Sequence, residues 1–134
     1  MATMTLFNAF KENALEVMNL GTDQLVVALT NTAPVATNSV LADITQIAYT
    51  NLSSRNLTTS ASAQTAGTYT LTLTDLVLTA SGAVGPFRYV VIYDETPTSP
   101  ADPLIGFIDY GSSISLANAE TFTIDFTGAA ITVS

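Results

Sequence analysis

The side chains that could carry out acid–base chemistry in this chain are almost all carboxylates. Eleven Asp and Glu residues stand against three Lys and Arg, and there is no histidine and no cysteine. The chain therefore lacks the commonest general base, the commonest zinc ligand and any thiolate nucleophile. Glycoside hydrolysis needs two facing carboxylates, but the spacing pairs no two of Asp94, Glu95, Asp102, Asp109 and Asp125. With no nucleophile elbow, phosphate-binding loop or dinucleotide motif either, we expect no enzyme activity and no cofactor.

One segment gathers the acids that are best placed to hold a metal ion. Asp94, Glu95 and Asp102 lie in the loop Asp94–Pro103, and calcium prefers carboxylate and carbonyl oxygens. The loop lacks the alternating ligands and the glycine of a dedicated calcium loop. Solvated loop acids are the simpler interpretation, and the sequence leaves calcium binding open.

The charge balance excludes two classes of partner. The net charge is −8, and Lys11, Arg55 and Arg88 are the only basic residues. Nucleic acid and anionic membranes are bound through clustered Lys and Arg, so we expect neither as a partner. Only 10% of the residues are charged, against roughly 25% in ordinary soluble domains. Such a surface suits burial against other subunits, and it also suits a hydroxyl-rich β domain that is simply soluble.

Arg88 is the most informative charge because it begins an apolar strand. On the face of Val90 and Ile92 an unpaired cation would be costly, so we predict a structural ion pair with Asp75 or Asp109. The alternative is an arginine at the strand end that reaches solvent.

The strands that must position these groups centre on one hairpin. Phe87–Tyr93 and Leu104–Tyr110 are rich in aromatic and β-branched residues, which favours paired strands. The first strand is apolar on both faces, with Phe87, Tyr89, Val91 and Tyr93 on one side and Val90 and Ile92 on the other. A strand of this kind is covered on both sides. A set of aromatic residues is expected in the core, although it could instead line a sugar-binding platform: Tyr89, Tyr93, Phe107, Tyr110, Phe122 and Phe126.

The N-terminal segment 5–19 has helical periodicity. Phe7, Phe10, Ala14 and Val17 follow one face, with Thr5 as the expected N-cap and Gly21 ending the helix. This face either packs on the chain's own sheet or forms an arm that docks on a neighbouring subunit. In the second case Phe7, Phe10 and Val17 are interface residues.

The remaining segments predict further strands and loops over residues 24–134. Leu25, Val27 and Leu29 share one face of a strand, and residues 40–52 form a short helix or turn. Residues 53–68 form an exposed loop or an edge strand. In 69–79 the alternation changes phase, which predicts a bulge or break near Asp75, and 111–120 is predicted to be a loop. Residues 121–126 and 129–134 are the last strands. The fold class is therefore mainly β: a single domain, an antiparallel β-sandwich of jelly-roll-like type with one N-terminal α-helix.

The strand series resembles a family of small structural proteins of tailed bacteriophages. The resemblance lies in Asp75–Leu78, Arg88–Asp94, Pro103–Gly111, Phe122–Phe126 and the terminal Ile131–Ser134, together with the N-terminal helix, Asp23 and the following strand. It implies a virion protein that decorates or cements the outer capsid surface. The implied partners are the major capsid protein and further copies of the chain in a homotrimer. A tail or head-fibre component is the first alternative, and a carbohydrate-binding β-sandwich module is the second.

Overall fold

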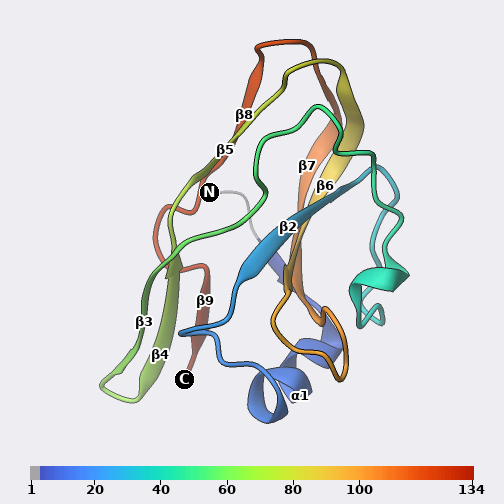
Figure 1. The fold of residues 1–134 in the computed structure, drawn as a ribbon. Helices are drawn as coiled ribbons and strands as arrows, with labels where there is room; N and C mark the ends of the chain where they lie inside the picture. Colours follow the sequence, from blue (N-terminus) through green and yellow to red (C-terminus); the bar gives the residue numbers. More distant parts are fainter. Residues whose placement is uncertain (1–3) are drawn as a thin grey trace.

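The longest strands of the protein, β6 (Val84–Asp94) and β7 (Leu104–Leu116), form one antiparallel hairpin. They appear at the centre of Figure 1, a computed structural model that describes residues 4–134. This hairpin is the one that the aromatic and β-branched runs predict. β1 (Met4–Leu6) pairs with β7 and β2 (Leu25–Thr30) pairs with β6, which gives a main sheet in the order β1-β7-β6-β2.

Two smaller antiparallel sheets complete the body. β3 (Thr59–Thr65), β4 (Thr68–Leu73) and β9 (Ile131–Val133) form one, in the order β3-β4-β9. β5 (Leu76–Thr79) pairs with β8 (Thr121–Ile124) in the other. The predicted mainly β fold, with antiparallel sheets in a sandwich-like arrangement and one α-helix near the N-terminus, is confirmed.

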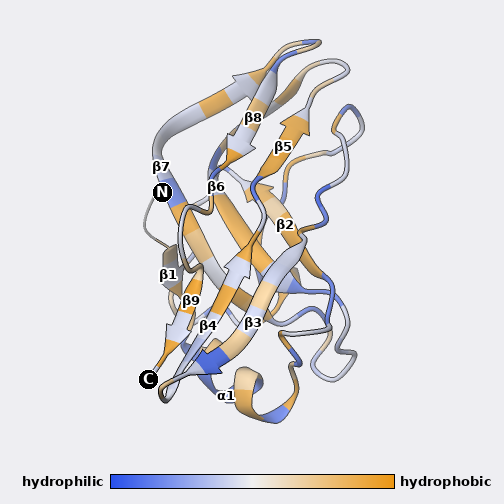
Figure 2. Ribbon diagram, turned by 90° about the vertical axis from the view of Figure 1, so that its left-hand side faces the viewer, coloured by the Kyte–Doolittle hydropathy of each residue, from blue (hydrophilic) through white to orange (hydrophobic). Residues whose placement is uncertain are grey.

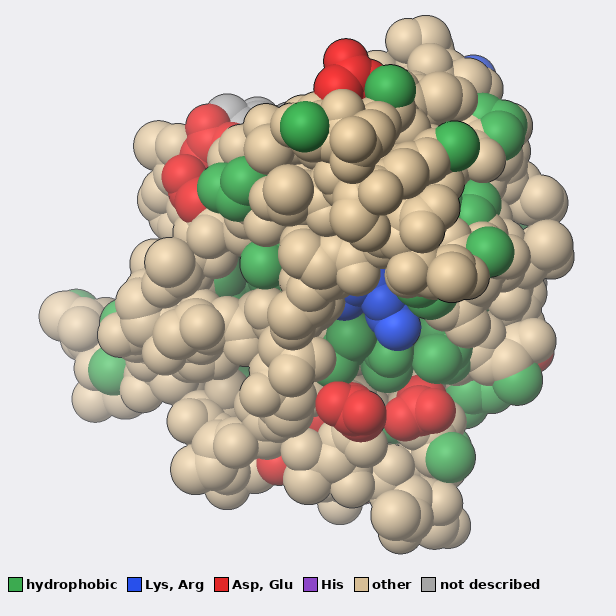
Figure 3. Space-filling view, turned by 45° about the horizontal axis from the view of Figure 1, so that its top comes forward, with side chains coloured by type: hydrophobic (Ala, Val, Ile, Leu, Met, Phe, Trp, Pro, Cys, Tyr) green, Lys and Arg blue, Asp and Glu red, His purple; other side chains and the backbone are tan. Residues whose placement is uncertain are grey.

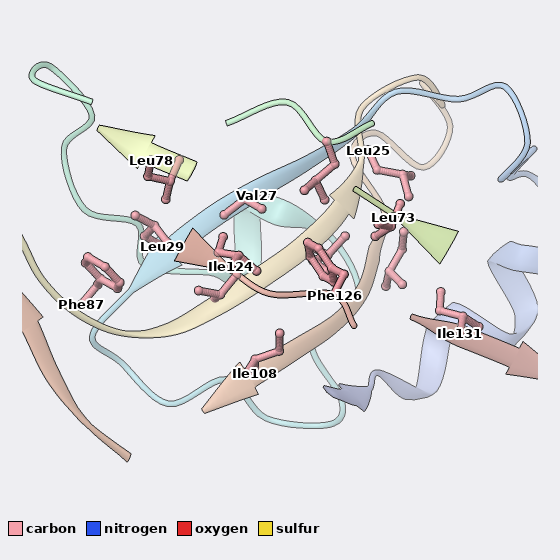
Figure 4. Close-up of a cluster of buried hydrophobic side chains, with 14 of the residues drawn as sticks. Leu25, Val27, Leu29, Leu73, Leu78, Phe87, Ile108, Ile124, Phe126 and Ile131 are labelled. Carbon is pink, nitrogen blue, oxygen red and sulfur yellow. The ribbon is translucent and has the colours of Figure 1, made fainter. Parts of the chain in front are cut away.

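The principal core fills the space between the main sheet and the two smaller sheets (Figure 4). The main sheet contributes Leu25, Val27 and Leu29 from β2, while the smaller sheets contribute residues such as Leu78 and Ile124. The odd-numbered residues of β2 point into this core, as their alternation predicts. Burial of these side chains is the main stabilising term for such a sandwich.

A second, smaller core covers the opposite face of the main sheet. Val26 and Ala28 of β2 and Val91 of β6 pack there with Phe7 and Ile44, and Leu41 of the short 3₁₀ helix η1 (Leu41–Asp43) lies against them. All six residues of β2 are buried as a result. Coverage on both faces explains why β2 and β6 read as nearly continuous apolar runs (Figure 2).

The helix α1 runs from Asn8 to Glu16 and is shorter than the predicted 5–19. Thr5, the expected N-cap, instead lies in β1 opposite Phe107, and Phe7 occupies the N-cap position. The backbone before the helix is used for sheet pairing, because Phe7 N–H still donates to Ile105 O at 3.1 Å. Ladder formation with β7 therefore overrides the helical periodicity of these residues.

Two predictions about the strands around Asp75 and Gly111 have different outcomes. The predicted break near Asp75 is confirmed, since β4 ends at Leu73 and β5 begins at Leu76 in another sheet. The predicted loop 111–120 is wrong, because β7 continues to Leu116 and pairs Ile114 with Phe87. Residues 53–68, for which a loop and an edge strand were both open, include the edge strand β3.

The side-chain alternation of β6 also differs from the prediction. Phe87 lies in the principal core with Val90 and Ile92, not on the side of Val91 and Tyr93. The register shifts between Phe87 and Tyr89, where Arg88 alone stands opposite residues 110–113 of β7. This bulge changes the facing of Phe87, and a further register shift between Val84 and Phe87 brings Val84 into the same core.

Candidate functional site

Arg88 pairs with Asp109 across the β6–β7 bulge. Arg88 Nε donates to Asp109 Oδ1 at 2.8 Å and Nη2 donates to Oδ2 at 3.0 Å, a two-pronged geometry. The Arg88 contact, with a second bond from Gly111 N–H, lowers the pKa of Asp109, and the same contact raises the pKa of Arg88. The two side chains are 39% and 42% exposed, so the pair is a surface pair and not the buried one that the Val90 face predicts.

Asp75, the other predicted partner of Arg88, serves a different purpose. Its Oδ1 accepts a hydrogen bond from Phe126 N–H at 2.6 Å. Asp75 lies in the break between β4 and β5, so this bond connects the break to the segment after β8. Its role is therefore structural.

The loop Asp94–Pro103 does not bring together the three acids that could have bound calcium. Asp94 is the last residue of β6 and is fully buried, while Glu95 is exposed and Asp102 is half-buried. Over residues 4–134, no group of three or more acidic, histidine or cysteine side chains is placed to hold a metal ion. Burial, followed by a side-chain hydrogen bond with Asp23 from the segment between α1 and β2, raises the pKa of Asp94 to about 7.

The aromatic set belongs to the interior more than to a platform. Tyr89, Tyr93 and Phe126 are buried. Phe122 is half-buried and packs edge-to-face against both Phe87, at 5.3 Å between ring centroids, and Tyr110, at 5.0 Å. Phe107 stacks near Phe7 at 5.3 Å. The core interpretation of these residues therefore holds.

The three residues predicted as an interface are turned mostly inward. Phe7 is 0% exposed in the second core and Phe10 is 3% exposed in the principal core, so neither can dock on a neighbour. Val17, which follows the helix, is half-buried. The periodicity identified the apolar face of α1 correctly, but that face is occupied by the chain's own sheets.

The helix α1 lies near the ends of β4 and β9 at the lower part of the molecule (Figures 1 and 2). An apolar groove lies there, between the helix and these strands. Its larger part, about 630 Å³, is lined by helix and connector residues together with Ser62, Tyr69 and Val133. A smaller part of about 310 Å³ adjoins it along Ala14, Leu15 and Val133 and extends to Leu6 and Lys11. We call both parts together the α1–β9 groove.

Two of the most exposed large apolar side chains of the protein lie on this groove. Leu15 is 89% exposed and Val133 is 55% exposed. Neither follows from the helical or strand periodicity, because Leu15 interrupts the polar face of α1 and Val133 ends a three-residue strand. An exposed leucine inside an otherwise polar helix face was the one signal in the sequence that could have found the groove.

The groove also lies between two open strand edges. Within residues 4–134, β1 pairs with β7 alone and β9 pairs with β4 alone, so each is the last strand of its sheet. Leu6 of β1 and Thr132 and Val133 of β9 line the smaller part of the groove. Open edges beside an apolar floor are features that protein partners use for docking.

The surface around these features carries little charge. Figure 3 shows one face of the molecule, on which scattered acidic groups and a small basic area are surrounded by uncharged side chains and backbone. Arg55, another basic residue, is engaged internally: its guanidinium lies 3.7 Å from the centre of the Tyr49 ring and donates to Val27 O at 2.6 Å. No helix within residues 4–134 has the length and apolar character needed to cross a membrane.

Searches against protein-family models, curated protein sequences and solved structures find no match to this chain.

Proposed function

We propose that this protein is a structural component of a tailed-bacteriophage virion that decorates the outer capsid and stabilises it. The α1–β9 groove is the observation that carries the proposal. It exposes Leu15 and Val133 on a molecule in which charged residues are only 10% of the chain. The strand-pattern resemblance to phage structural proteins supplies the virion context, with the major capsid protein and further copies of the chain as partners.

The physical mechanism is the burial of apolar surface at repeated contacts. Full burial of one leucine side chain contributes about 1.5–3 kcal/mol, and part of this is offset by the rigid-body freedom lost on association. A single contact of this size is weak. Three subunits that bind one capsid site together convert several weak contacts into one strong attachment.

The proposal is tested with purified heads that lack the protein. Wild-type protein is expected to bind them in numbers that match the capsid symmetry and to sediment alone as three subunits. Leu15→Gln, which keeps a good helix former but removes the apolar contact, is expected to weaken binding by about ten- to a hundred-fold.

Two strand valines provide a matched control. Val133 on the groove and Val77 on β5 are similarly exposed, at 55% and 51%, and threonine has nearly the same shape as valine. Val133→Thr is expected to reduce head binding, whereas Val77→Thr is expected to leave it unchanged. Equal effects of the two variants, or wild-type protein that does not bind heads, would overturn the proposal. If antibodies against the protein label assembled phage on the tail alone, the protein is a tail component and not a capsid decoration protein.

A further inference from the structure

Asp94 is an acid in an unusual position at the end of β6. Its residue exposure is 0%. Oδ1 accepts a hydrogen bond from Thr96 N–H at 3.1 Å, but Oδ2 is buried and receives no hydrogen bond from the part of the chain that the structure describes. An ionised carboxylate with one unsatisfied buried oxygen is strongly disfavoured.

The side chain that faces Asp94 is a second acid. Leu25 pairs with Asp94, and Gln24 is hydrogen-bonded to Glu95 and Thr96, which places Asp23 beside the end of β6. After burial, a side-chain hydrogen bond with Asp23 is the largest cause that raises the pKa of Asp94, and the negative charge of Asp102 adds to it. Two ionised carboxylates have only acceptors. A hydrogen bond between them therefore requires that one of the two holds a proton.

This contact joins two segments that are also connected by hydrogen bonds of the Gln24 backbone. Residues 17–24, the connector between α1 and β2, meet the loop 95–103 through Glu95 N–H, which donates to Gln24 O at 2.9 Å. Gln24 N–H in turn donates to Thr96 Oγ1 at 2.9 Å. The acid pair closes the same junction at side-chain level.

The connector also forms part of the α1–β9 groove. Met18, Asn19, Leu20 and Gly21 line its larger part. The carboxylate of Asp23 holds this turn directly, because Asn19 N–H donates to Asp23 Oδ2 at 2.9 Å. A change in the charge of the acid pair therefore acts on a residue that shapes the groove wall.

We propose that Asp23 and Asp94 share a single proton and form a pH-sensitive latch, closed when the proton is present, that holds the connector in the shape that completes the α1–β9 groove. The effect on the groove as a docking surface rests on the function proposed above, while the latch itself does not.

The composition of the chain allows the titration of this acid pair to be distinguished from that of other groups. Burial, followed by the hydrogen bond to Asp23, raises the pKa of Asp94 to about 7. With no histidine or cysteine, ordinary side chains titrate near pH 4 or near pH 10, and only the α-amino group has a reference value of about 8. A transition centred near pH 7 in the folded protein therefore reports the acid pair.

The pH dependence of the folding stability follows from the difference in proton binding between the folded and the unfolded protein. The folded state keeps a proton that the unfolded chain releases near pH 4, so stability falls as the pH rises from about 4 to 7 and then levels off. We expect the urea midpoint of the wild-type protein to be lower at pH 8 than at pH 5. In Asp94→Asn the amide is neutral at every pH and can donate to Asp23, so this variant is expected to have the same midpoint at both pH values.

The connector can be observed directly through Met18, which lines the groove. In protein labelled at the methionine methyl groups, the Met18 signal is expected to shift with a midpoint near pH 7 in the wild type and to stay constant in Asp94→Asn. Asp23→Asn removes the neighbouring charge and is expected to move this midpoint to lower pH. Titration of the Asp94 carboxyl carbon in the wild type gives the same information if a variant fails to fold.

Three outcomes would overturn the latch. They are a carboxyl titration of Asp94 near pH 4, a Met18 signal that does not change between pH 5 and 8, and calorimetric uptake of Ca²⁺ at pH 8 that disappears in Asp94→Asn. The last result would assign the site to a cation instead of a proton. None of these measurements uses capsids, so the latch can fail while the decoration function stands, and the reverse also holds.

Discussion

The two ends of β6 place acids in opposite surroundings. Near its beginning, Arg88 reaches across the bulge to Asp109, both side chains are well exposed, and the pKa of Asp109 is lowered. At its end, Asp94 is buried beside Asp23, and its pKa is raised to about 7. Two aspartates on one hairpin therefore respond to pH in opposite directions. Burial and the sign of the neighbouring charge decide which response each one has.

The residue type alone does not predict how a charged side chain of this protein responds to pH. Asp109 and Asp94 both flank apolar strand segments in the sequence. At the bulge the Arg88 and Asp109 side chains are exposed, whereas a regular ladder from Leu25–Asp94 to Thr30–Tyr89 keeps β2 against the last part of β6. Local strand geometry thus determines the electrostatic environment.

The largest expected effect on stability distinguishes two adjacent residues at the bulge of β6. Phe87 is fully buried against Phe122, and the next residue, Arg88, is substantially exposed. Phe87→Ala is expected to lower the free energy of unfolding by about 3–5 kcal/mol, because it leaves a cavity in the principal core. Arg88→Ala is expected to have only a small effect. Urea denaturation of both variants measures the contrast, and similar losses would mean that the bulge does not separate the two environments.

A smaller loss of stability is expected when a glycine of the β6–β7 hairpin is replaced by alanine, and its cause differs between Gly106 and Gly111. A Cβ on Gly106 would lie 2.9 Å from Thr5 O and from Met4 Cγ, so Gly106→Ala must push β1 away from β7. We expect a loss of about 1–3 kcal/mol. Gly111, in the bulge, has open space around it but a φ of +86°, so Gly111→Ala is expected to cost about 1 kcal/mol through backbone strain alone.

Unfolding midpoints of the two variants, together with amide exchange in β1, distinguish these causes. Faster exchange of β1 amides is expected for Gly106→Ala only. Loss of β1 protection in Gly111→Ala would contradict the assignment of strain to the bulge.

The smallest expected effect belongs to the surface pair. Because the pKa of Asp109 is lowered by Arg88, the contribution of the pair is present above about pH 4 and is lost as the pH falls through the folded-state pKa. Asp109→Asn is therefore expected to reduce the acid sensitivity of unfolding slightly, and salt is expected to abolish the difference. If Asp109→Asn instead altered the pH dependence of stability between pH 5 and 8, Asp109 and not Asp94 would be the group that titrates in this range.

Much of the fold could be predicted because the apolar pattern is strong where strands are covered. The β6–β7 hairpin, the odd-numbered face of β2 and the break near Asp75 all follow from side-chain alternation and its change of phase. The ion pair of Arg88 with Asp109 was one of two candidates that the sequence offered. Less could be predicted where backbone pairing opposes the local pattern, as in β1 before the helix and in the continuation of β7 beyond Gly111.

The groove and the acid pair could not be predicted because each joins segments that are distant in the chain. Leu15 and Val133 are 118 positions apart, the difference of their numbers, and Asp23 and Asp94 are separated by all the strands from β2 to β6. Spacing along a sequence carries no information about such pairs when their residue types are common.

Residue types and their alternation predict a charge-poor β protein with a central apolar hairpin, and the side chains that could take part in chemistry are mostly carboxylates and hydroxyls. These properties depend on residue types and on a period of two, which any strand obeys wherever it is placed. Which acid is exposed, which is buried and which apolar side chains remain uncovered depends on how the sheets pack against each other. Solvent access and the distance between charges arise when the sheets pack, and both are set by contacts that no local pattern encodes.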